Sequence, residues 1–194
     1  DLGGTVNMAS GALIHVKEGT LRLEYGALSN WSNNKSDLTL ASGAIFDLWD
    51  NNNAGVFVDA LNGAGAITRS NYGQTGTITI GVDNGSGTFT GSITNPSGIT
   101  NLTKTGSGTQ TLSSALSTYS GVTTINQGKI IVAGGNAIGD SSAVVMSSSD
   151  ASAQLQLNAS ESVYSLAGGS ATAGAVNLQG NTLQIGASTG NATT

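Results

Sequence analysis

Three aspartates are the residues whose type and spacing come closest to a reactive site. Asp37, Asp59 and Asp83 are 22 and 24 residues apart, which is close to one turn of a solenoid built from short strands. Stacked on one outer face, such carboxylates would share a cation or act as the acid and base that cleave a polysaccharide. Aspartate also favours turns, and a turn that recurs once per coil gives the same spacing. We favour the turn interpretation, predict no catalytic residue, and keep a polysaccharide-degrading enzyme as the less favoured alternative.

The remaining candidates for metal or nucleophilic chemistry are weak. His15 is the single histidine, and its alternation with Ile14 and Val16 predicts a surface side chain without a ligand role. The segment DNNNAG (50–55) resembles the start of a calcium loop, but Leu61 stands where that loop needs a glutamate. The chain contains no cysteine, which excludes disulfides and thiolate metal sites. We therefore predict no metal ligand, no cofactor-binding residue and no Ser–His–Asp triad.

A binding surface is best supported in the N-terminal third of the chain. Six of the nine aromatic residues precede residue 75, together with most of the charged residues. Trp31 and Trp49 are of the type that stacks on sugars, so we predict a glycan or a host cell-surface protein as the ligand there. The alternative is that longer loops in this region need aromatic packing anchors. The residues concerned are Tyr25, Trp31, Phe46, Trp49, Phe57, Tyr72, Lys17, Glu18, Arg22, Glu24, Lys35 and Arg69.

The composition favours a turn-rich β protein and excludes several partners. The 194 residues include 29 glycines, and only 9% are charged, so good helix formers are scarce. The net charge is −5, and no basic stripe is present to neutralise phosphates, so we predict no nucleic-acid binding. No apolar segment approaches the roughly 20 residues of a membrane helix, so we predict no direct membrane insertion.

Short alternating segments predict β-strands throughout the chain. In each, two large apolar residues flank a polar one, which is the period-two pattern of a half-buried strand. We expect Ile80 and Ile125 to point inward and Thr79 and Thr124 to point outward. Glycine, asparagine and serine bound nearly all of these segments, so the strands should be short and helix close to nil. The segments are 21–23, 38–40, 46–48, 78–80, 155–157 and 183–185.

The strand segments also recur at long range, which is typical of a solenoid. Residues 58–81 match residues 163–186 at an offset of about 105, and 19–28 resembles 128–138. We therefore expect two super-repeats, 19–127 and an incomplete 128–194, with Leu61 equivalent to Leu166 and Ile80 to Ile185. In a parallel β-helix each strand pairs with its equivalent in the next coil, so outward threonines form ladders without the repulsion of stacked charges.

Residues 102–132, LTKTGSGTQTLSSALSTYSGVTTINQGKIIV, carry a recognisable motif. The segment resembles the autotransporter-associated β-strand repeat, also called the passenger-associated transport repeat. The positions that match this family's pattern are Leu102, Thr103, Lys104, Gly106, Gly108, Leu112, Thr118, Tyr119, Ser120, Gly121, Thr123, Thr124, Ile125, Asn126 and Gly128. Leu116 and Ser117 stand where the family usually has an Ala–Asn pair.

The resemblance implies a right-handed parallel β-helix on the exterior of a bacterium, associated with the outer membrane. We expect one all-β domain over residues 1–194, of roughly nine coils at the inter-strand spacing, as a piece of a longer solenoid. The predicted function is a structural stalk or passenger module with an adhesive role, and it is not enzymatic. The alternative is a subunit that self-assembles into an extracellular fibre, because an uncapped solenoid exposes strand edges for end-to-end self-association.

Overall fold

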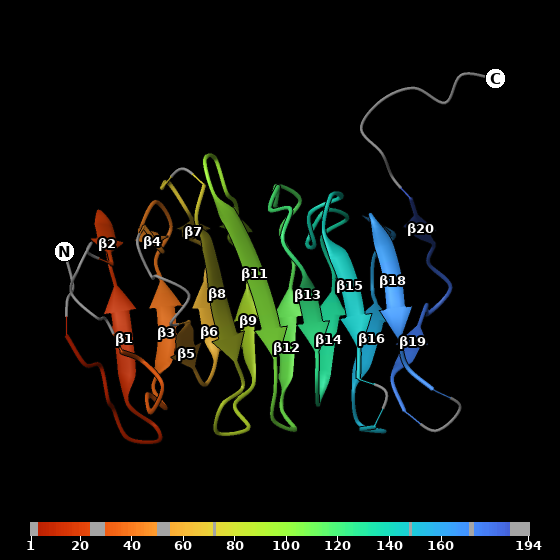
Figure 1. The fold of residues 1–194 in the computed structure, drawn as a ribbon, viewed down its shortest axis with the longest axis horizontal. Helices are drawn as coiled ribbons and strands as arrows, with labels where there is room; N and C mark the ends of the chain where they lie inside the picture. Colours follow the sequence, from red (N-terminus) through yellow and green to blue (C-terminus); the bar gives the residue numbers. More distant parts are fainter. Residues whose placement is uncertain are drawn as a thin grey trace.

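The chain winds into a parallel β-solenoid whose coils stack along one long axis (Figure 1). A computed structural model describes residues 4–23, 30–49, 55–71, 73–147, 149–170 and 173–186. Within these ranges the chain forms twenty strands and no helix, and every pair of neighbouring strands is parallel. The predicted all-β solenoid is confirmed. In this part of the chain no helical segment of membrane-spanning length and hydropathy is found.

Each full coil visits three faces of the solenoid in a fixed order. The first face is one continuous sheet with the order β1 (Leu13–Val16), β3 (Asp37–Leu40), β6 (Leu61–Gly63), β9 (Gly87–Phe89), β12 (Thr109–Leu112), β14 (Lys129–Val132), β16 (Gln154–Leu157) and β19 (Ala175–Asn177). The third face is a six-stranded sheet with the order β5 (Val56–Val58), β8 (Thr75–Ile80), β11 (Ile99–Lys104), β13 (Thr123–Ile125), β15 (Ala143–Met146) and β18 (Ser165–Gly168).

The second face is divided into two smaller sheets. Its first part consists of β2 (Thr20–Arg22), β4 (Ile45–Asp47), β7 (Ala66–Thr68) and β10 (Ser92–Ile93), and its second part of β17 (Glu161–Val163) and β20 (Leu183–Ile185). Between them, residues 113–122 and 133–142 cross this face without forming a strand. Tyr119, Ala137 and Ile138 from these crossings are nevertheless buried. The core is therefore continuous where the sheet is not.

The length of a coil varies because the corners between faces differ. Paired positions on the first face are separated by as few as 20 residues, between Thr109 and Lys129, and by as many as 26, between Gly63 and Phe89. The first sheet has eight strands, so seven turns separate its two ends. The described residues thus form fewer coils than the nine expected, because several corners are longer than a minimal turn.

Alternation along each strand separates the core from the surface. Ile80 and Ile125 are fully buried, as predicted, and they stack in register on either side of Lys104. Thr124 lies half-buried on the outer side. Thr79 also lies on the outer side but is only 9% exposed, since it pairs in register with Phe57 and Thr103 on the two neighbouring strands.

The predicted equivalence between residues 58–81 and 163–186 is wrong. Leu61 lies on the first face and Leu166 on the third. Ile80 lies on the third face and is fully buried, whereas Ile185 lies on the second face and is 54% exposed. The matched segments follow the same order of strands but are displaced by one face, because the 105-residue offset is not a whole number of coils. The division of the chain at residue 128 stays a prediction.

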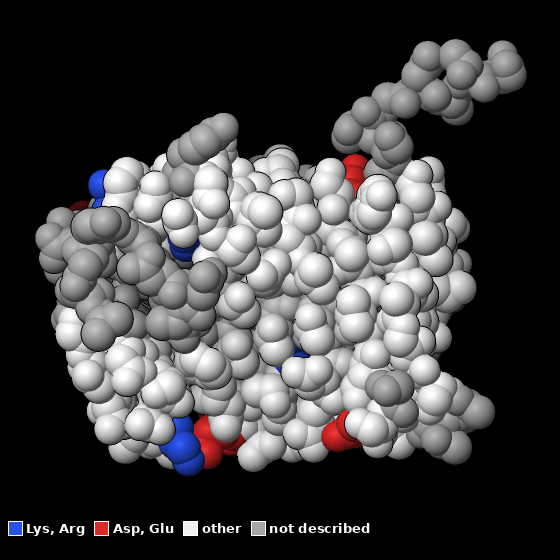
Figure 2. All heavy atoms as spheres, viewed as in Figure 1, with Lys and Arg blue, Asp and Glu red and all other residues white. Residues whose placement is uncertain are grey.

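Charge is distributed unevenly over the surface. Figure 2 views the third face, and between its rims few basic or acidic side chains are visible. The outward row on this face includes Thr79, Thr103, Thr124, Val145 and Ala167, which are all uncharged. Charged side chains of one sign would repel each other at the ~4.8 Å spacing of successive coils, whereas these uncharged side chains stack without repulsion.

Candidate functional site

Two of the three aspartates that the sequence singles out, Asp37 and Asp59, bond to the backbone at the corners of the solenoid. Asp37 Oδ1 accepts the N–H of Ala60 over 3.0 Å. Asp59 Oδ1 accepts the N–H groups of Asp83 and Gly85, each over 2.7 Å. In each case the donor belongs to the next coil, so the carboxylate satisfies backbone groups that have no strand partner at the corner. This geometry favours the turn interpretation of their spacing.

Asp83 also has the wrong electrostatics for a general acid. Its carboxylate pairs with Lys35, with 2.9 Å between Oδ1 and Nζ. Hydrogen bonds from Ser10 and Lys35 lower the pKa of the Asp83 carboxyl, whereas a general acid needs a raised pKa. Across the described ranges, no three His, Cys, Asp or Glu side chains are grouped so that they would hold a metal ion.

His15 lies on the outer side of β1, at the N-terminal end of the solenoid. It is exposed and pairs in register with Thr39 on the next strand. It borders a hollow that is also lined by Ile14, Lys17 and Leu21, the apolar members being inward side chains of the first described coil. Glu18 lines the same hollow, and the outward position of His15 agrees with the sequence prediction.

The two tryptophans lie in different environments. Trp31 is fully buried and packs on Phe46, with 5.7 Å between ring centres. It is a core residue, so its predicted role in stacking on a sugar is wrong. Trp49 is half-buried beside β4 and stays accessible. The alternative that aromatics here are packing anchors therefore holds for Trp31 and Phe46, while Trp49 remains a binding candidate.

Trp49 lies against a charged cluster. The Cζ atom of Arg22 is 4.7 Å from the centre of the Trp49 ring, within cation–π distance. Arg22 Nε donates to Asp47 Oδ2 over 3.0 Å. Ser70 Oγ and N donate to the same carboxylate over 2.6 and 3.2 Å, so Asp47 is buried but fully partnered. The predicted patch members Glu24, Tyr25 and Tyr72, like most of the DNNNAG segment, lie outside the described residues.

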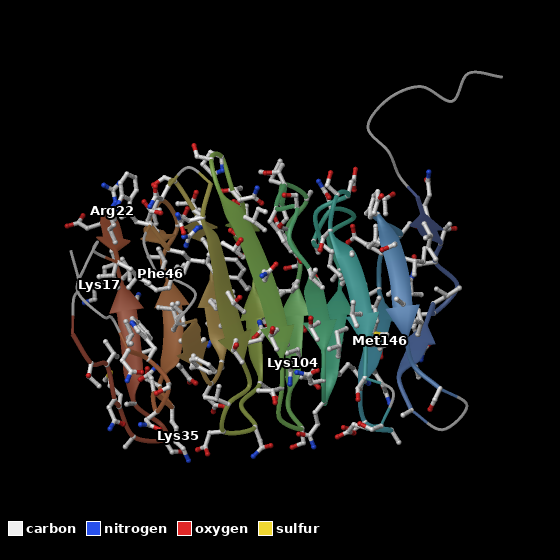
Figure 3. All side chains as sticks on the ribbon, viewed as in Figure 1. Lys17, Arg22, Lys35, Phe46, Lys104 and Met146 are labelled. Atoms are coloured by element: carbon white, nitrogen blue, oxygen red, sulfur yellow. The ribbon has the colours of Figure 1, made fainter. Side chains whose placement is uncertain are left out.

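Lys104 is a buried cation that composition alone does not reveal. Its side chain points into the solenoid, and its Nζ donates to the carbonyl oxygens of Thr105, of Gly106 over 2.7 Å and of Gln127 over 3.5 Å. Burial lowers the pKa of Lys104 to about 8, and the charge of Asp59 partly opposes this shift. Figure 3 shows Lys104 near the corner that follows β11. The ammonium group therefore ties together the corners of two consecutive coils.

The same segment requires its two glycines. Gly106 has a φ of 62°, which disfavours any other residue, and a Cβ there would collide with the carbonyl oxygen of Gly81 in the preceding coil. A Cβ on Gly108 would meet the carbonyl oxygen of Gly85 in the same way. A Cβ on Gly128, in the next coil, would likewise meet the carbonyl oxygens of Gly106 and Gly108, so the two corners that Lys104 bridges lie close together.

A network of buried hydroxyl groups connects the segment that follows β12 to the next coil. Tyr119 OH and Thr123 Oγ1 are 2.6 Å apart, and Thr123 Oγ1 and Ser142 Oγ are 2.9 Å apart. Ser142 Oγ donates to the carbonyl oxygen of Gly121 over 2.6 Å. Burial raises the pKa of the Tyr119 hydroxyl, so it stays protonated and is available as a donor. The network links the crossing segment 113–122 to β13 and to Ser142 in the next coil.

These features, the inward lysine, the stacked glycines and the buried tyrosine, all fall within residues 102–132. The passenger-associated-transport-repeat family matches this same range. The chain carries a passenger-associated transport repeat. The transport repeat comprises the end of β11, the strands β12 and β13, and β14, and it forms the middle of the solenoid.

Comparison with curated proteins extends the similarity well beyond the transport repeat. The chain is 39% identical over 140 residues to the adhesin BmaC autotransporter of Brucella suis biovar 1 (strain 1330). The aligned region covers 70% of this chain, and the chain spans 4% of the length of that relative. No solved structure matches the chain.

Two further buried polar residues were not predicted from the sequence. Gln110 is buried on the inner side of β12, and its side-chain amide bonds to the backbone of Leu61. Glu161 is 3% exposed, and its Oε2 accepts the N–H of Ala137 over 2.9 Å. Burial raises the pKa of Glu161 to about 7, against hydrogen bonds from backbone N–H groups that lower it. A period-two reading places both side chains inward, but neither residue type suggests burial.

Proposed function

We propose that the chain is a rigid extracellular module of a bacterial surface protein, which serves as a stalk and presents an adhesive surface. The observation that carries this proposal is the eight-stranded parallel sheet that passes through the transport repeat without interruption. Each coil in such a sheet is hydrogen-bonded to the next over several residues, so bending the rod requires breaking backbone hydrogen bonds. A rod of this kind holds its outer side chains at fixed positions.

Adhesion and surface location are supported by the similarity to a protein that is called an autotransporter adhesin. The proposed location is the bacterial cell surface, in association with the outer membrane. The proposed ligand is a glycan or a protein on a host cell. Two described surfaces are candidates for this contact, the uncharged outer row of the third face and the Arg22–Trp49 cluster.

A non-enzymatic role is part of the proposal. The carboxylates of Asp37 and Asp59 are already bonded to backbone N–H groups, and that of Asp83 is paired with Lys35. If Asp37 or Asp59 took part in catalysis, backbone N–H groups at a corner of the next coil would lose their partners.

The proposal is tested by attachment of beads coated with the purified chain to cultured host cells. Beads with the folded chain should attach more than beads with the same chain denatured before coating, and soluble chain should compete. Equal attachment of the two kinds of bead would contradict an adhesive role. Release of sugar fragments from host glycans that stops in an Asp59→Asn variant would instead establish the enzymatic alternative.

End-to-end self-association is a second candidate, because apolar side chains are exposed at the last described coil. Ile185 and Leu178 are 54% and 43% exposed, and β19 has a partner on one side among the described strands. Unpaired parallel strands and apolar ends are a template for another chain. Electron micrographs of the purified chain should show filaments if this candidate is right, and single particles at all concentrations if it is wrong.

A further inference from the structure

The guanidinium group of Arg22 is held in place before any ligand arrives. Its Nε is bonded to Asp47, and the indole of Trp49 lies beneath its Cζ at 4.7 Å. Asp47 is in turn held by two donors of Ser70. The cluster therefore has a fixed geometry, which reduces the entropy that a ligand would lose by ordering it.

The outer edge of this guanidinium remains available. Among the described residues, Nη1 and Nη2 of Arg22 have no hydrogen-bond partner, and the side chain is 43% exposed. Figure 3 shows Arg22 at the upper rim of the first coils, away from the core. Two parallel N–H donors in a rigid plane match the two oxygens of a carboxylate. The geometry of this edge therefore suits an oxyanion with two coplanar oxygens, such as a carboxylate.

The neighbouring side chains favour a carboxylate that belongs to a sugar. Trp49 offers half-buried aromatic surface beside the guanidinium, and sugar C–H groups pack on such surface. The outward row that begins with Arg22 and Asp47 continues with Thr68 and Thr94, whose Oγ1 atoms are hydrogen-bonded over 3.2 Å. Thr68 lies two strands from Arg22, about 9.6 Å along the axis with the buried Asp47 between them, and Thr94 lies about 4.8 Å beyond Thr68. An acidic side chain of a protein would bind the paired N–H donors of Arg22, here called the fork, but would not contact the threonine hydroxyl groups.

We propose that Arg22, Trp49, Thr68 and Thr94 form a binding site for an acidic glycan, in which Arg22 holds the carboxylate of a uronic acid residue. This inference rests on the proposed adhesive function and names its ligand class. The chain carries a net charge of −5, which opposes the approach of an anionic ligand. A single site should therefore be weak, with a Kd of about 1 mM. Many copies on one cell would raise the effective affinity by avidity.

The two tryptophans provide an internal control for the test. In nitrogen-15 correlation spectra, titration with digalacturonate should shift the indole N–H signal of Trp49 to saturation. The signal of Trp31, which is fully buried, should stay in place and report that the chain remains folded. Neutral digalactose should bind at least about tenfold more weakly, because it lacks the carboxylate that the fork recognises.

Variants separate the fork from the charge. Arg22→Lys keeps the positive charge but loses the planar fork, and it should weaken digalacturonate binding about tenfold. Lys35→Gln removes one positive charge at the opposite edge of the solenoid and should leave the Kd unchanged (Figure 3). In both variants an unmoved Trp31 signal shows that the fold is intact.

Three results would overturn the inference. They are equal binding of digalacturonate and digalactose, full binding by Arg22→Lys, and tighter binding of an acidic hexapeptide than of digalacturonate. The last would assign the cluster to a protein ligand. None of these results touches the bead-attachment test, so the adhesive function can stand while this site fails. Conversely, uronate binding without bead attachment would confirm the site and contradict the adhesive function.

Discussion

The side-chain amide of Gln110 bonds to the backbone of Leu61 two coils away, with Nε2 donating to the carbonyl oxygen over 2.8 Å and Oε1 accepting the N–H over 3.1 Å. Gly87 lies between them on β9 and pairs in register with Gln110. Because Gly87 has no side chain, the amide passes it, and a Cβ there would meet the carbonyl oxygen of Leu61 at 2.5 Å. The only register pair between β6 and β9 is Gly63 with Phe89, so the amide supplies the hydrogen bonds that this part of the sheet lacks.

Gln110→Leu should therefore destabilise the chain although leucine is apolar and similar in size. The substitution leaves the N–H and the carbonyl group of Leu61 buried without these partners, at a cost of about 2–4 kcal/mol in the free energy of unfolding. Urea denaturation measures this change. The matched control is Gln154→Leu on the outer side of β16, which should shift the free energy of unfolding by no more than about 0.5 kcal/mol. Equal effects of the two substitutions would refute the role of the amide.

The inward and outward positions of β8 and β13 should respond differently to substitution. Ile80→Asp places an ion in a fully buried rung and should lower the free energy of unfolding by several kcal/mol. Thr79→Ser and Thr124→Gln replace one polar outer side chain with another and should change it by less than about 1 kcal/mol. Melting temperatures of the three variants test the core assignment. An Ile80→Asp protein that melts within a degree or two of the parent would show that this side of the strand is not the core.

Lys104 should make the chain more stable at alkaline pH. Its pKa is about 8 in the folded chain and 10.5 in a model compound, so between these values the unfolded chain binds the proton and the folded chain does not. Stability contributed by this group therefore rises with pH across that window, by about 1–3 kcal/mol. Lys104→Met has no proton to lose, so the parent should gain stability relative to it between pH 8 and 10.5. Parallel pH profiles of the two proteins in urea denaturation would contradict the burial of the charge.

Glu161 should have the opposite effect at acidic pH. Its pKa is raised from 4.5 to about 7, so the folded chain binds the proton more tightly than the unfolded chain does. The stabilising contribution is complete below pH 4.5 and is lost as the pH rises through 7. The parent should thus lose about 1–3 kcal/mol relative to Glu161→Gln between pH 4.5 and 7. A constant difference between these two proteins over that range would show that the carboxyl is not buried as described.

The local pattern of the strands was predictable from sequence, but the identity of the faces was not. Alternation placed Ile80 inward because two apolar residues on either side of a polar one usually point to the same side of a strand. The same alternation puts Lys104 and Gln110 inward, two residues from Leu102 and Leu112. Their burial was missed because buried lysine and glutamine are uncommon and because their partners are backbone groups, which leave no mark in the sequence.

The long-range repeat was misread for a related reason. The segments that contain Ile80 and Ile185 are similar because both hold strands and corners in the same order. That order recurs from one face of the solenoid to the next, so it does not identify a face. Since coils range from 20 to 26 residues in length, sequence offset does not fix the face. Trp31 and Trp49 were likewise indistinguishable, because the burial of Trp31 among core residues such as Phe46 depends on tertiary packing.

The register of one coil on the next is tested most directly by an engineered disulfide. Thr79 and Thr103 pair in register on the outer side of the third face, so their Cα atoms should be about 4.8 Å apart, within reach of a disulfide. Because the chain has no cysteine, any cross-link in Thr79→Cys with Thr103→Cys comes from this pair. The control pair, Thr79→Cys with Thr124→Cys, is two coils apart and, at about 9.6 Å, too distant to be bridged. We predict oxidation to an intramolecular disulfide in the first pair and free thiols in the second. Free thiols in the first pair, or equal cross-linking of both, would contradict the parallel in-register solenoid.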